Sequence, residues 1–357
     1  MYEYCHMRRS TGNPGKHLLL LILLCALTAC RKETRVTPAF YYWKTTWQPS
    51  EASQKTFEKG NFRKLYLRLC DIGISPETGA VVPKDVLRLG ENPQLPNAEI
   101  IPVIFLEPPV LQTLKTEKSI TELSGNIARF TDAFCRQQGW NIKEFQLDCD
   151  WTSRTADVYF ELVRALKKES FFSGKTLSVT LRGHQVKYPG KGGIPPADRC
   201  MLMAYNMGDI RTLTPESSIL DVPTAKDYLQ NIGAYPLPID LALPIFRWTL
   251  WYRGGRLLGI LRGVDPEGLA QLPFLQKEKK GNLYRSLADT SLGGYRIQTG
   301  DLIKAESPQP DEVSAVAAYI SGKLKQKAFT VAFYHLDDTN LNRYDTRQLE
   351  EILHHCR

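Results

Sequence analysis

The residues best suited to do chemistry lie in the segment EFQLDCDWTSRT, residues 144–155. Asp148 and Asp150 stand two positions apart in a largely apolar run, and side chains two apart in a β-strand point the same way. Two like charges brought together out of water are costly unless a ligand or a partner compensates them. We therefore expect the pair either to bind a polar ligand or to anchor the strands around it.

The elements that must position this pair form an alternating series. Strand-like apolar runs occur at residues 39–43, 64–69, 100–106, 144–151, 176–181, 199–205, 239–246 and 328–334. Amphipathic helical patterns fit between them, most clearly at 119–138, 155–168, 224–231 and 311–326, and a helix near 347–355 closes the chain. The alternation predicts an α/β fold, a (β/α)8 TIM barrel spanning residues 38–357. A doubly wound open sheet is the alternative, but no Gly-rich phosphate loop follows the first strand.

The interval between the seventh and eighth predicted strands is too long for a simple loop. It contains several glycines, a charged run at 276–280 and a strand-like stretch at 295–304. Long structureless connections are uncommon in compact domains. The sequence therefore predicts a small inserted subdomain at about residues 250–305.

Active sites of TIM barrels lie at the C-terminal ends of the strands. Asp148 and Asp150 fall at that end of the fourth predicted strand. The other candidate residues near strand ends are Asp71, Glu107, Tyr205, Asn206 and Asp209, together with Trp43, Trp151 and Trp248. Converging carboxylates suit glycoside chemistry, and tryptophans can stack on sugar rings. We expect Asp148, Asp150, Glu107 and Asp209 to be catalytic candidates and the remaining residues to contact substrate.

Four motifs in order, LDCDW, MLMAYN, LALPIF and FYHLDD, resemble those of the chitinase-like glycoside hydrolases of family eighteen. The resemblance covers about residues 38–340 and implies a TIM barrel with an α/β insertion between strands seven and eight. It also implies that Asp150 orients an acetamido group of the substrate, and that Tyr205 hydrogen-bonds to that group.

The chain departs from this family at the acid. Phe145 occupies the position of the first aspartate of the family motif, and Thr152 occupies that of the general acid glutamate. A threonine hydroxyl cannot donate a proton as a carboxylic acid with a raised pKa does. Three interpretations stay open: a hydrolase that takes its acid from Glu107, Asp71 or Asp209, a glycan-binding barrel that has lost catalysis, or a structural lipoprotein.

The N-terminus predicts export. Arg8, Arg9 and Lys16 precede an apolar run at 18–27 that is too short to span a membrane, and the sequence LTAC follows at 27–30. These features resemble a bacterial lipoprotein signal, which implies a signal peptide at 1–29, lipidation of Cys30 and a tether at 30–37. Arg31 favours the outer membrane, on either its periplasmic or its extracellular face.

The net charge and the cysteine pattern limit the kinds of binding partner that the sequence predicts. Removing residues 1–29 lowers the net charge from +8 to +6, and no basic stripe with interleaved aromatics is present, so nucleic acid is disfavoured. The cysteines after Cys30 show no paired metal-ligand spacing, and we expect buried free thiols, with no metal and no cofactor. The expected partners are a polysaccharide and, through the lipid anchor, a membrane, with the protein itself a monomer.

Overall fold

The computed structural model describes residue 1, residues 34–90 and residues 93–357. The predicted signal peptide beyond Met1 and the predicted lipidation site Cys30 lie outside the described residues. The first strand begins at Arg35, inside the predicted tether.

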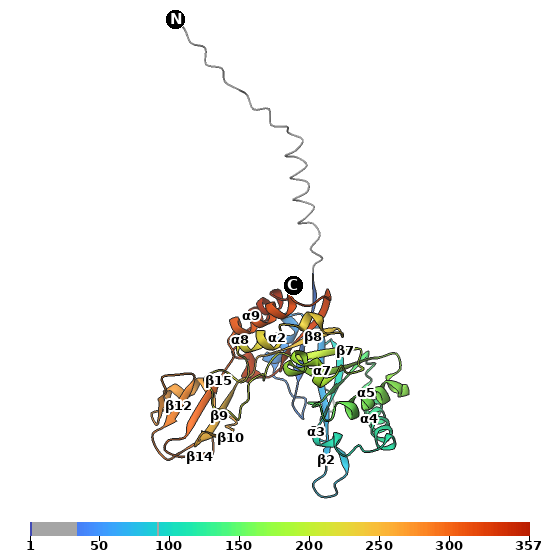
Figure 1. Cartoon of the computed structure of the whole chain (residues 1–357), viewed down its shortest axis with the longest axis horizontal. Coiled ribbons are helices and arrows are strands. Elements are labelled where there is room, and N and C mark those ends of the chain that lie inside the picture. Colours follow the sequence, from blue (N-terminus) through green and yellow to red (C-terminus); the bar gives the residue numbers. More distant parts are fainter. Residues whose placement is uncertain (2–33, 91–92) are drawn as a thin grey trace. The chain divides into compact units, whose positions relative to one another are not determined.

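Eight parallel strands close into a barrel (Figure 1). They are β1 (Arg35–Tyr42), β2 (Lys64–Ile74), β4 (Glu99–Leu106), β5 (Glu144–Asp148), β6 (Thr176–Arg182), β7 (Arg199–Met203), β8 (Ile239–Pro244) and β16 (Ala328–Tyr334). Because β1 pairs with both β16 and β2, the ring has no open edge. This confirms the predicted TIM barrel. A further strand, β3 (Val81–Lys84), runs antiparallel to the outer end of β2.

Helices follow most strands, and each predicted helix is present. The longer ones are α2 (Glu51–Lys59), α4 (Glu117–Gln138), α5 (Ala156–Lys168), α8 (Val222–Tyr228), α9 (Pro310–Ser321) and α11 (Thr346–His354). Short turns form α3 (Pro108–Leu111), α6 (Gly183–Lys187), α7 (Pro189–Gly192) and α10 (Asp338–Leu341). The longest, α4, begins at Thr116, which accepts a hydrogen bond from Ser119 N, and ends at Gly139 in the left-handed conformation.

Strand β5 shows how the sequence alternates between two environments. Phe145 and Leu147 are fully buried, and the ring of Phe145 packs on Phe172, which precedes β6. Glu144 bonds Lys64 of β2 at 2.9 Å, although β4 lies between β5 and β2 in the sheet. Such a contact must cross the barrel interior. The polar column Glu144, Gln146 and Asp148 therefore faces inward, as period-two alternation requires.

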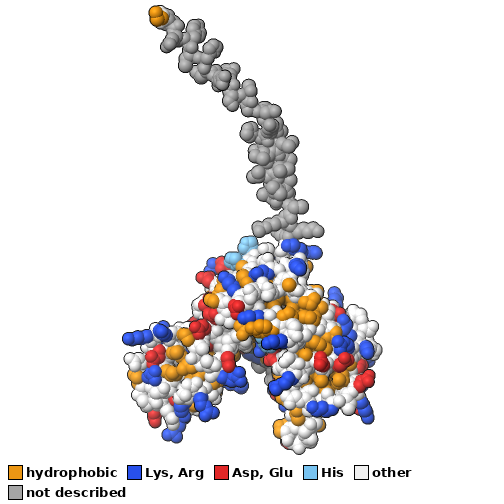
Figure 2. Space-filling view, viewed as in Figure 1, with side chains coloured by type: hydrophobic (Ala, Val, Ile, Leu, Met, Phe, Trp, Pro, Cys, Tyr) orange, Lys and Arg blue, Asp and Glu red, His pale blue; other side chains and the backbone are white. Residues whose placement is uncertain are grey.

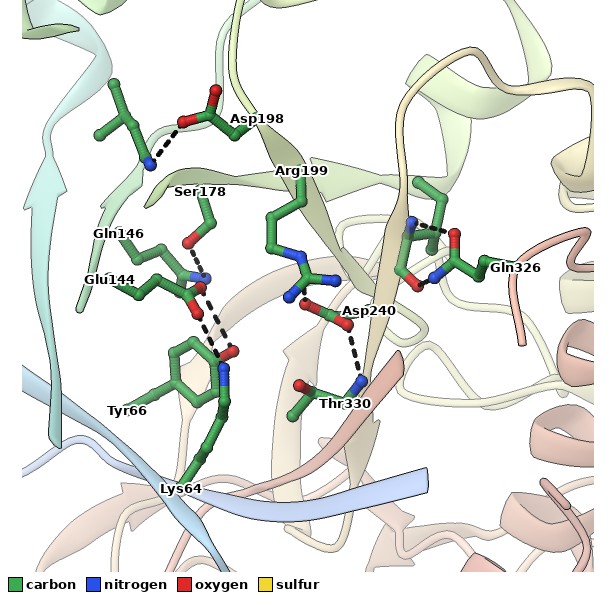
Figure 3. Close-up of polar contacts among 12 residues, drawn as sticks. Lys64, Tyr66, Glu144, Gln146, Ser178, Asp198, Arg199, Asp240, Gln326 and Thr330 are labelled. Atoms are coloured by element: carbon green, nitrogen blue, oxygen red, sulfur yellow. Dashed lines mark hydrogen bonds and ion pairs between the residues drawn. The ribbon is translucent and has the colours of Figure 1, made fainter. Parts of the chain in front are cut away.

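Below the C-terminal ends of the strands, the barrel interior contains hydrogen-bonded polar and charged side chains (Figure 3). The Tyr41 hydroxyl donates a hydrogen bond to Gln146 Oε1 at 2.6 Å, and Gln146 Nε2 donates one to the Ser178 hydroxyl at 3.3 Å. On the opposite strands, Asp240 pairs with Arg199 at 3.1 Å and accepts from Thr330 N at 2.6 Å. Because each buried charge has a partner, this layer fixes the strand ends below the site.

Between β8 and β16 the chain forms a second sheet. Its strands are β9 (Trp248–Arg253), β10 (Arg256–Ile260), β11 (Leu275–Lys277), β12 (Leu283–Ser286) and β15 (Leu302–Glu306), antiparallel in the order β10-β9-β15-β12-β11. A hairpin of β13 (Thr290–Leu292) and β14 (Tyr295–Ile297) and a 3₁₀ turn, η3 (Pro266–Gln271), complete it. The family resemblance implies an α/β insertion, whereas this segment has no α-helix. That it is a separate subdomain stays a prediction.

The surface is mixed in charge: Figure 2 shows acidic and basic side chains interspersed on the visible face. Cys70, Cys135, Cys149, Cys200 and Cys356 are free and buried, as expected. Within residues 34–90 and 93–357, no helix is both long and apolar enough to cross a membrane.

Candidate functional site

A cleft of about 540 Å³ opens at the C-terminal ends of the barrel strands. The residues that line it from the barrel and its loops are Trp43, Phe105, Asp148, Asp150, Arg182, Met203, Tyr205, Asn206, Phe246, Arg247, Tyr334, His335, Thr339 and Asn340. Its other wall comes from the second sheet, with Trp248 and residues 260–264. Of the residues predicted from sequence, the fold brings together Asp148, Asp150, Tyr205, Asn206, Trp43 and Trp248.

Asp148 ends β5 as the uppermost member of the inward polar column. The Thr180 hydroxyl on β6 donates to its Oδ1 at 2.6 Å. Burial raises the pKa of Asp148 to about 7, and the charge of Asp150 adds to the rise, although the hydrogen bond from Thr180 opposes it. Near neutral pH this carboxyl therefore exists in both protonated and ionised forms.

Asp150 lies two residues beyond the end of β5, where the chain has left the strand. Its Oδ1 accepts an ion-pair contact from Arg182 Nε at 2.9 Å, and Arg182 Nη2 donates to Oδ2 at 3.5 Å. Arg182 ends β6, so the ion pair ties two adjacent strand ends together. The guanidinium compensates the charge that the pair of aspartates would otherwise leave unpaired.

Four aromatic side chains curve around the cleft from β1 to the second sheet: Trp43, Tyr334, Phe246 and Trp248, here called the aromatic arc. Successive ring centroids lie 5.7 Å apart from Trp43 to Tyr334, 5.7 Å from Tyr334 to Phe246 and 5.5 Å from Phe246 to Trp248. Both tryptophans are only partly buried. Their exposed faces give the cleft an apolar surface of the kind on which sugar rings stack.

Trp248 is fixed by a buried carboxylate of the second sheet. Its indole Nε1 donates to Glu306 Oε2 at 2.7 Å, and Glu306 also pairs with Lys304 at 2.6 Å. Glu306 and Lys304 are almost completely buried. Glu306 further accepts from Ser218 N at 2.9 Å, which links the sheet to the loop after β7. The position of this tryptophan is therefore set by a satisfied polar network.

Three further polar residues line the cleft beside the arc. Tyr205 packs between Phe246 and Tyr334, with its hydroxyl 3.0 Å from Met203 Sδ, and burial holds its pKa well above the usual value. Asn206 has a left-handed backbone, φ +54°, which asparagine tolerates. Asn206 Oδ1 and His335 Nδ1 are both buried, and neither has a hydrogen-bond partner among the described residues. Burial lowers the pKa of His335 to about 4, so its imidazole is neutral at pH 7.

The fold does not bring the other predicted residues into the cleft wall. Trp151 is fully buried, stacks on Tyr159 at 4.9 Å and donates its indole N–H to Gly192 O. Asp71 forms a two-point ion pair with Arg68, at 2.7 and 2.6 Å. Trp151 is therefore a core residue, and the carboxylate of Asp71 is already occupied.

Two further candidates for the acid, Glu107 and Asp209, form ion pairs outside the cleft. Lys84 of β3 donates to both carboxylate oxygens of Glu107, at 3.1 and 3.2 Å. A Cβ added at Gly73 would lie 2.4 Å from Glu107 Oε2, so the carboxylate packs directly against the backbone of β2. Asp209 is exposed and pairs with Arg211, whose hydrogen bonds hold the pKa of Asp209 below its usual value. Neither residue lines the cleft.

Thr152, at the position of the family acid, also lies outside the cleft. Its backbone N–H donates to the Thr155 hydroxyl at 3.0 Å at the start of α5. It lines a separate hollow with residues such as Pro108 and Leu111. Residue 152 therefore differs from the family acid in two ways: it has no carboxyl group, and it does not line the cleft.

Several lining residues were missed by the sequence-based prediction, notably Arg182, Phe246, Tyr334 and His335. Phe246 and Tyr334 are the last residues of predicted strands, which was a usable signal because strand ends form the site. Arg182 follows the fifth predicted strand by one residue, but a single arginine at a strand end carries no distinctive pattern. Among the described residues, no group of three or more His, Cys, Asp or Glu could hold a metal ion.

Comparison with known proteins finds similar folds among solved structures. No protein-family model and no curated protein matches the chain. Solved structures do match: the spore cortex-lytic enzyme SleL of Bacillus cereus is 13% identical, with a TM-score of 0.54, over 91% of this chain and 75% of that one. A chitinase from Chromobacterium violaceum is 12% identical, with a TM-score of 0.54, over 89% of this chain and 99% of that one.

A third match is a GH18 chitinase from Cycas revoluta, solved as a double mutant with (GlcNAc)4. It is 13% identical, with a TM-score of 0.53, over 89% of this chain and 98% of that one. The fold of the barrel is similar to the folds of these three enzymes. At such identities the likeness concerns the fold, and a function must be argued from this chain's own residues.

Proposed function

We propose that this protein is carbohydrate-active and binds a glycan in the cleft at the C-terminal face of its glycoside-hydrolase-like barrel. The observation that carries the proposal is that the aromatic arc and the Asp148–Asp150 pair line one cleft. Sugars present apolar ring faces and polar edges, so they need both kinds of wall. The unpartnered Asn206 Oδ1 and His335 Nδ1 add an acceptor and a neutral ring nitrogen for sugar hydroxyls or an acetamido group.

Binding without hydrolysis is the function that the arrangement favours. The family acid position, Thr152, lies outside the cleft, and Glu107, Asp209 and Asp71 are not part of its wall. Among the residues that the structure describes, Asp148 and Asp150 are the carboxyl side chains that line the cleft. Following the family resemblance, we assign to Asp150 the orientation of an acetamido group and to Tyr205 a hydrogen bond to it.

Hydrolysis is the second candidate, and one observation supports it. The pKa of Asp148 is raised to about 7 by burial, and a carboxyl that is partly neutral at pH 7 can donate a proton to a leaving group. Asp148 would then replace the missing acid, while Asp150 keeps its contact with Arg182. Turnover that disappears in Asp148→Asn while binding survives would establish this candidate.

The binding test compares two aspartates of one chain. Asp150→Asn should abolish retention on an immobilised amino-sugar polymer such as chitin or peptidoglycan, because it removes a carboxylate acceptor and its contact with Arg182 from the cleft. Asp209→Asn is the matched control, since Asp209 is exposed and outside the cleft, and it should be retained like the wild type. Equal retention of both variants would place any glycan site elsewhere and overturn the proposal.

We further propose that the protein is anchored in the outer membrane by lipid on Cys30. The support is the sequence alone: the basic residues, the apolar run and the LTAC segment of residues 27–30. Two or more acyl chains give stable anchoring, so a barrel without spanning helices can still be membrane-bound.

A further inference from the structure

Three arginines line the glycan cleft, which is more positive charge than a neutral sugar requires: Arg182, Arg247 and Arg262. Arg182 is occupied by Asp150. The carboxylates in the same wall are Asp148 and Asp150, and burial favours the neutral form of the former. The positive charge of the other two arginines is therefore not balanced within the cleft wall.

Arg247 stands between Phe246 and Trp248, at the second-sheet end of the aromatic arc. Its Nε lies 3.4 Å from Asp265 Oδ1 and its Nη1 lies 3.8 Å from Glu267 Oε2, both loose contacts to half-exposed carboxylates. Glu267 is held more closely by Arg343, at 2.6 Å. Arg247 thus keeps hydrogen-bonding capacity for a ligand, while its own side chain is only 17% exposed.

Arg262 lies in the turn between β10 and η3, on the same wall as Arg247. It is exposed, and within residues 34–90 and 93–357 it forms no ion pair with a protein carboxylate. The guanidinium fork matches the geometry of a carboxylate, which it can bind through two parallel hydrogen bonds. Trp248 and the two arginines line the same cleft, so both guanidinium groups are available to the substituents of a sugar bound there.

We infer that the glycan bound here is acidic, a saccharide whose carboxylate is held by Arg247 and Arg262 while its rings lie on the aromatic arc. This inference rests on the proposed function and names its ligand class. Arg247 and Arg262 act as specificity-determining residues, and Arg182 keeps its role of holding Asp150.

The test uses the full chain and ligands that differ mainly in charge. The acidic probe is a hyaluronan oligosaccharide, the neutral counterpart is its carboxyl methyl ester, and a chitin oligosaccharide of equal length supplies an uncharged amino sugar. Affinities are measured by titration calorimetry. The acidic probe should bind about tenfold more tightly than its ester, the scale of a charge-assisted two-point contact. A sulfated chitin oligosaccharide, which carries sulfate but no carboxylate, should bind no more tightly than the ester, and tight binding of it would show that the arginines select any anion.

Variants locate the effect. Arg262→Gln and Arg247→Gln should each lower the affinity for the acidic probe about tenfold and leave that for the ester unchanged. Arg256→Gln, at an exposed arginine of β10 outside the cleft, is the matched control and should behave as wild type. Because Arg262 is exposed, its replacement should not disturb folding, so the test remains decisive if Arg247→Gln lowers stability.

Two failures are distinguishable. If chitin and the ester bind as tightly as the acidic probe, or if the arginine variants weaken all probes equally, the ligand is not selected by its charge and this inference is wrong, while glycan binding stands. If none of the probes binds, the proposed function itself fails.

Discussion

Arg182 and Asp150 form a two-point ion pair at the mouth of the barrel, with Nε 2.9 Å from Oδ1 and Nη2 3.5 Å from Oδ2. The partners come from the end of β6 and from the residues after β5, so the pair fixes Asp150 although the strand has already ended. The pair also explains how two aspartates can lie close together at the barrel mouth. Burial raises the pKa of Asp148, so it is partly protonated, and Asp150 is paired with Arg182.

Replacing Arg182 with glutamine should harm binding more than stability. The two side chains are 27% and 45% exposed, and ion pairs of that exposure contribute about 1 kcal/mol or less. The affinity for a chitin oligosaccharide should fall at least about tenfold, because Asp150 loses its orientation. Urea unfolding and calorimetric titration measure the two effects. A stability loss of several kcal/mol with unchanged affinity would show that the pair is structural.

Asp148 should make stability depend on pH. Its pKa is raised from 3.8 to about 7 by burial, so the folded protein holds the proton more tightly than the unfolded chain. The resulting stabilisation is complete below about pH 4 and is lost as the pH rises through about 7. Between about pH 5 and about pH 7.5, the free energy of unfolding should fall on the order of 2 kcal/mol further in the wild type than in Asp148→Asn.

Unfolding in urea at the two pH values measures this difference. The pKa of Asp240 is also raised by burial, to about 6, but Asp240 is present in both proteins and its contribution cancels. Glu122→Gln, on the exposed side of α4, serves as the control and should follow the wild type. Parallel pH profiles for the wild type and Asp148→Asn would contradict the assignment.

Restoring the family acid at its sequence position should not restore hydrolysis. Thr152→Glu would place a carboxyl at the start of α5, in the hollow beside Pro108 and not in the cleft. We expect release of a fluorogenic group from a chitobioside to stay at the wild-type level. Release well above that level would mean that residue 152 does reach the bound sugar, and the boundary of the site would have to be redrawn.

Cys30 should decide membrane attachment. If it carries lipid, Cys30→Ser should move the full-length protein from the membrane fraction to the soluble periplasm, because a peptide tail alone gives almost no anchoring. Cys135→Ser is a suitable control, since Cys135 is buried in α4 and free. A Cys30→Ser protein that stays on membranes after a high-salt wash would rule out the lipid anchor.

The sequence was sufficient for the barrel because each strand is marked by an apolar run and several of these runs are separated by clear helical patterns. It was also sufficient for Asp148, whose place on the inward column follows from the alternation Glu144, Phe145, Gln146, Leu147. The prediction failed for Trp151 because β5 ends at Asp148 and the chain then turns. Alternation no longer applies beyond that point, and the indole packs into the core.

The cleft could be predicted only in part because the positions of several side chains depend on contacts between segments that are distant in the sequence. Trp248 was predicted as a candidate, but its position depends on Glu306, which lies on another strand of the second sheet. Lys84 removes Glu107 from consideration, and β3, which carries that lysine, was not predicted at all. Pairings of this kind depend on sheet topology, which no local pattern encodes.

Hydrogen–deuterium exchange with and without a saturating amino-sugar oligomer shows whether the cleft at the strand ends binds a glycan. If it does, exchange should slow in residues 203–208, 246–264 and 334–340, which carry the cleft wall, and should not change in residues 108–115 and 152–158 around the Thr152 hollow. Protection confined to the latter segments, or an exchange pattern that the oligomer leaves unchanged, would contradict glycan binding in the cleft.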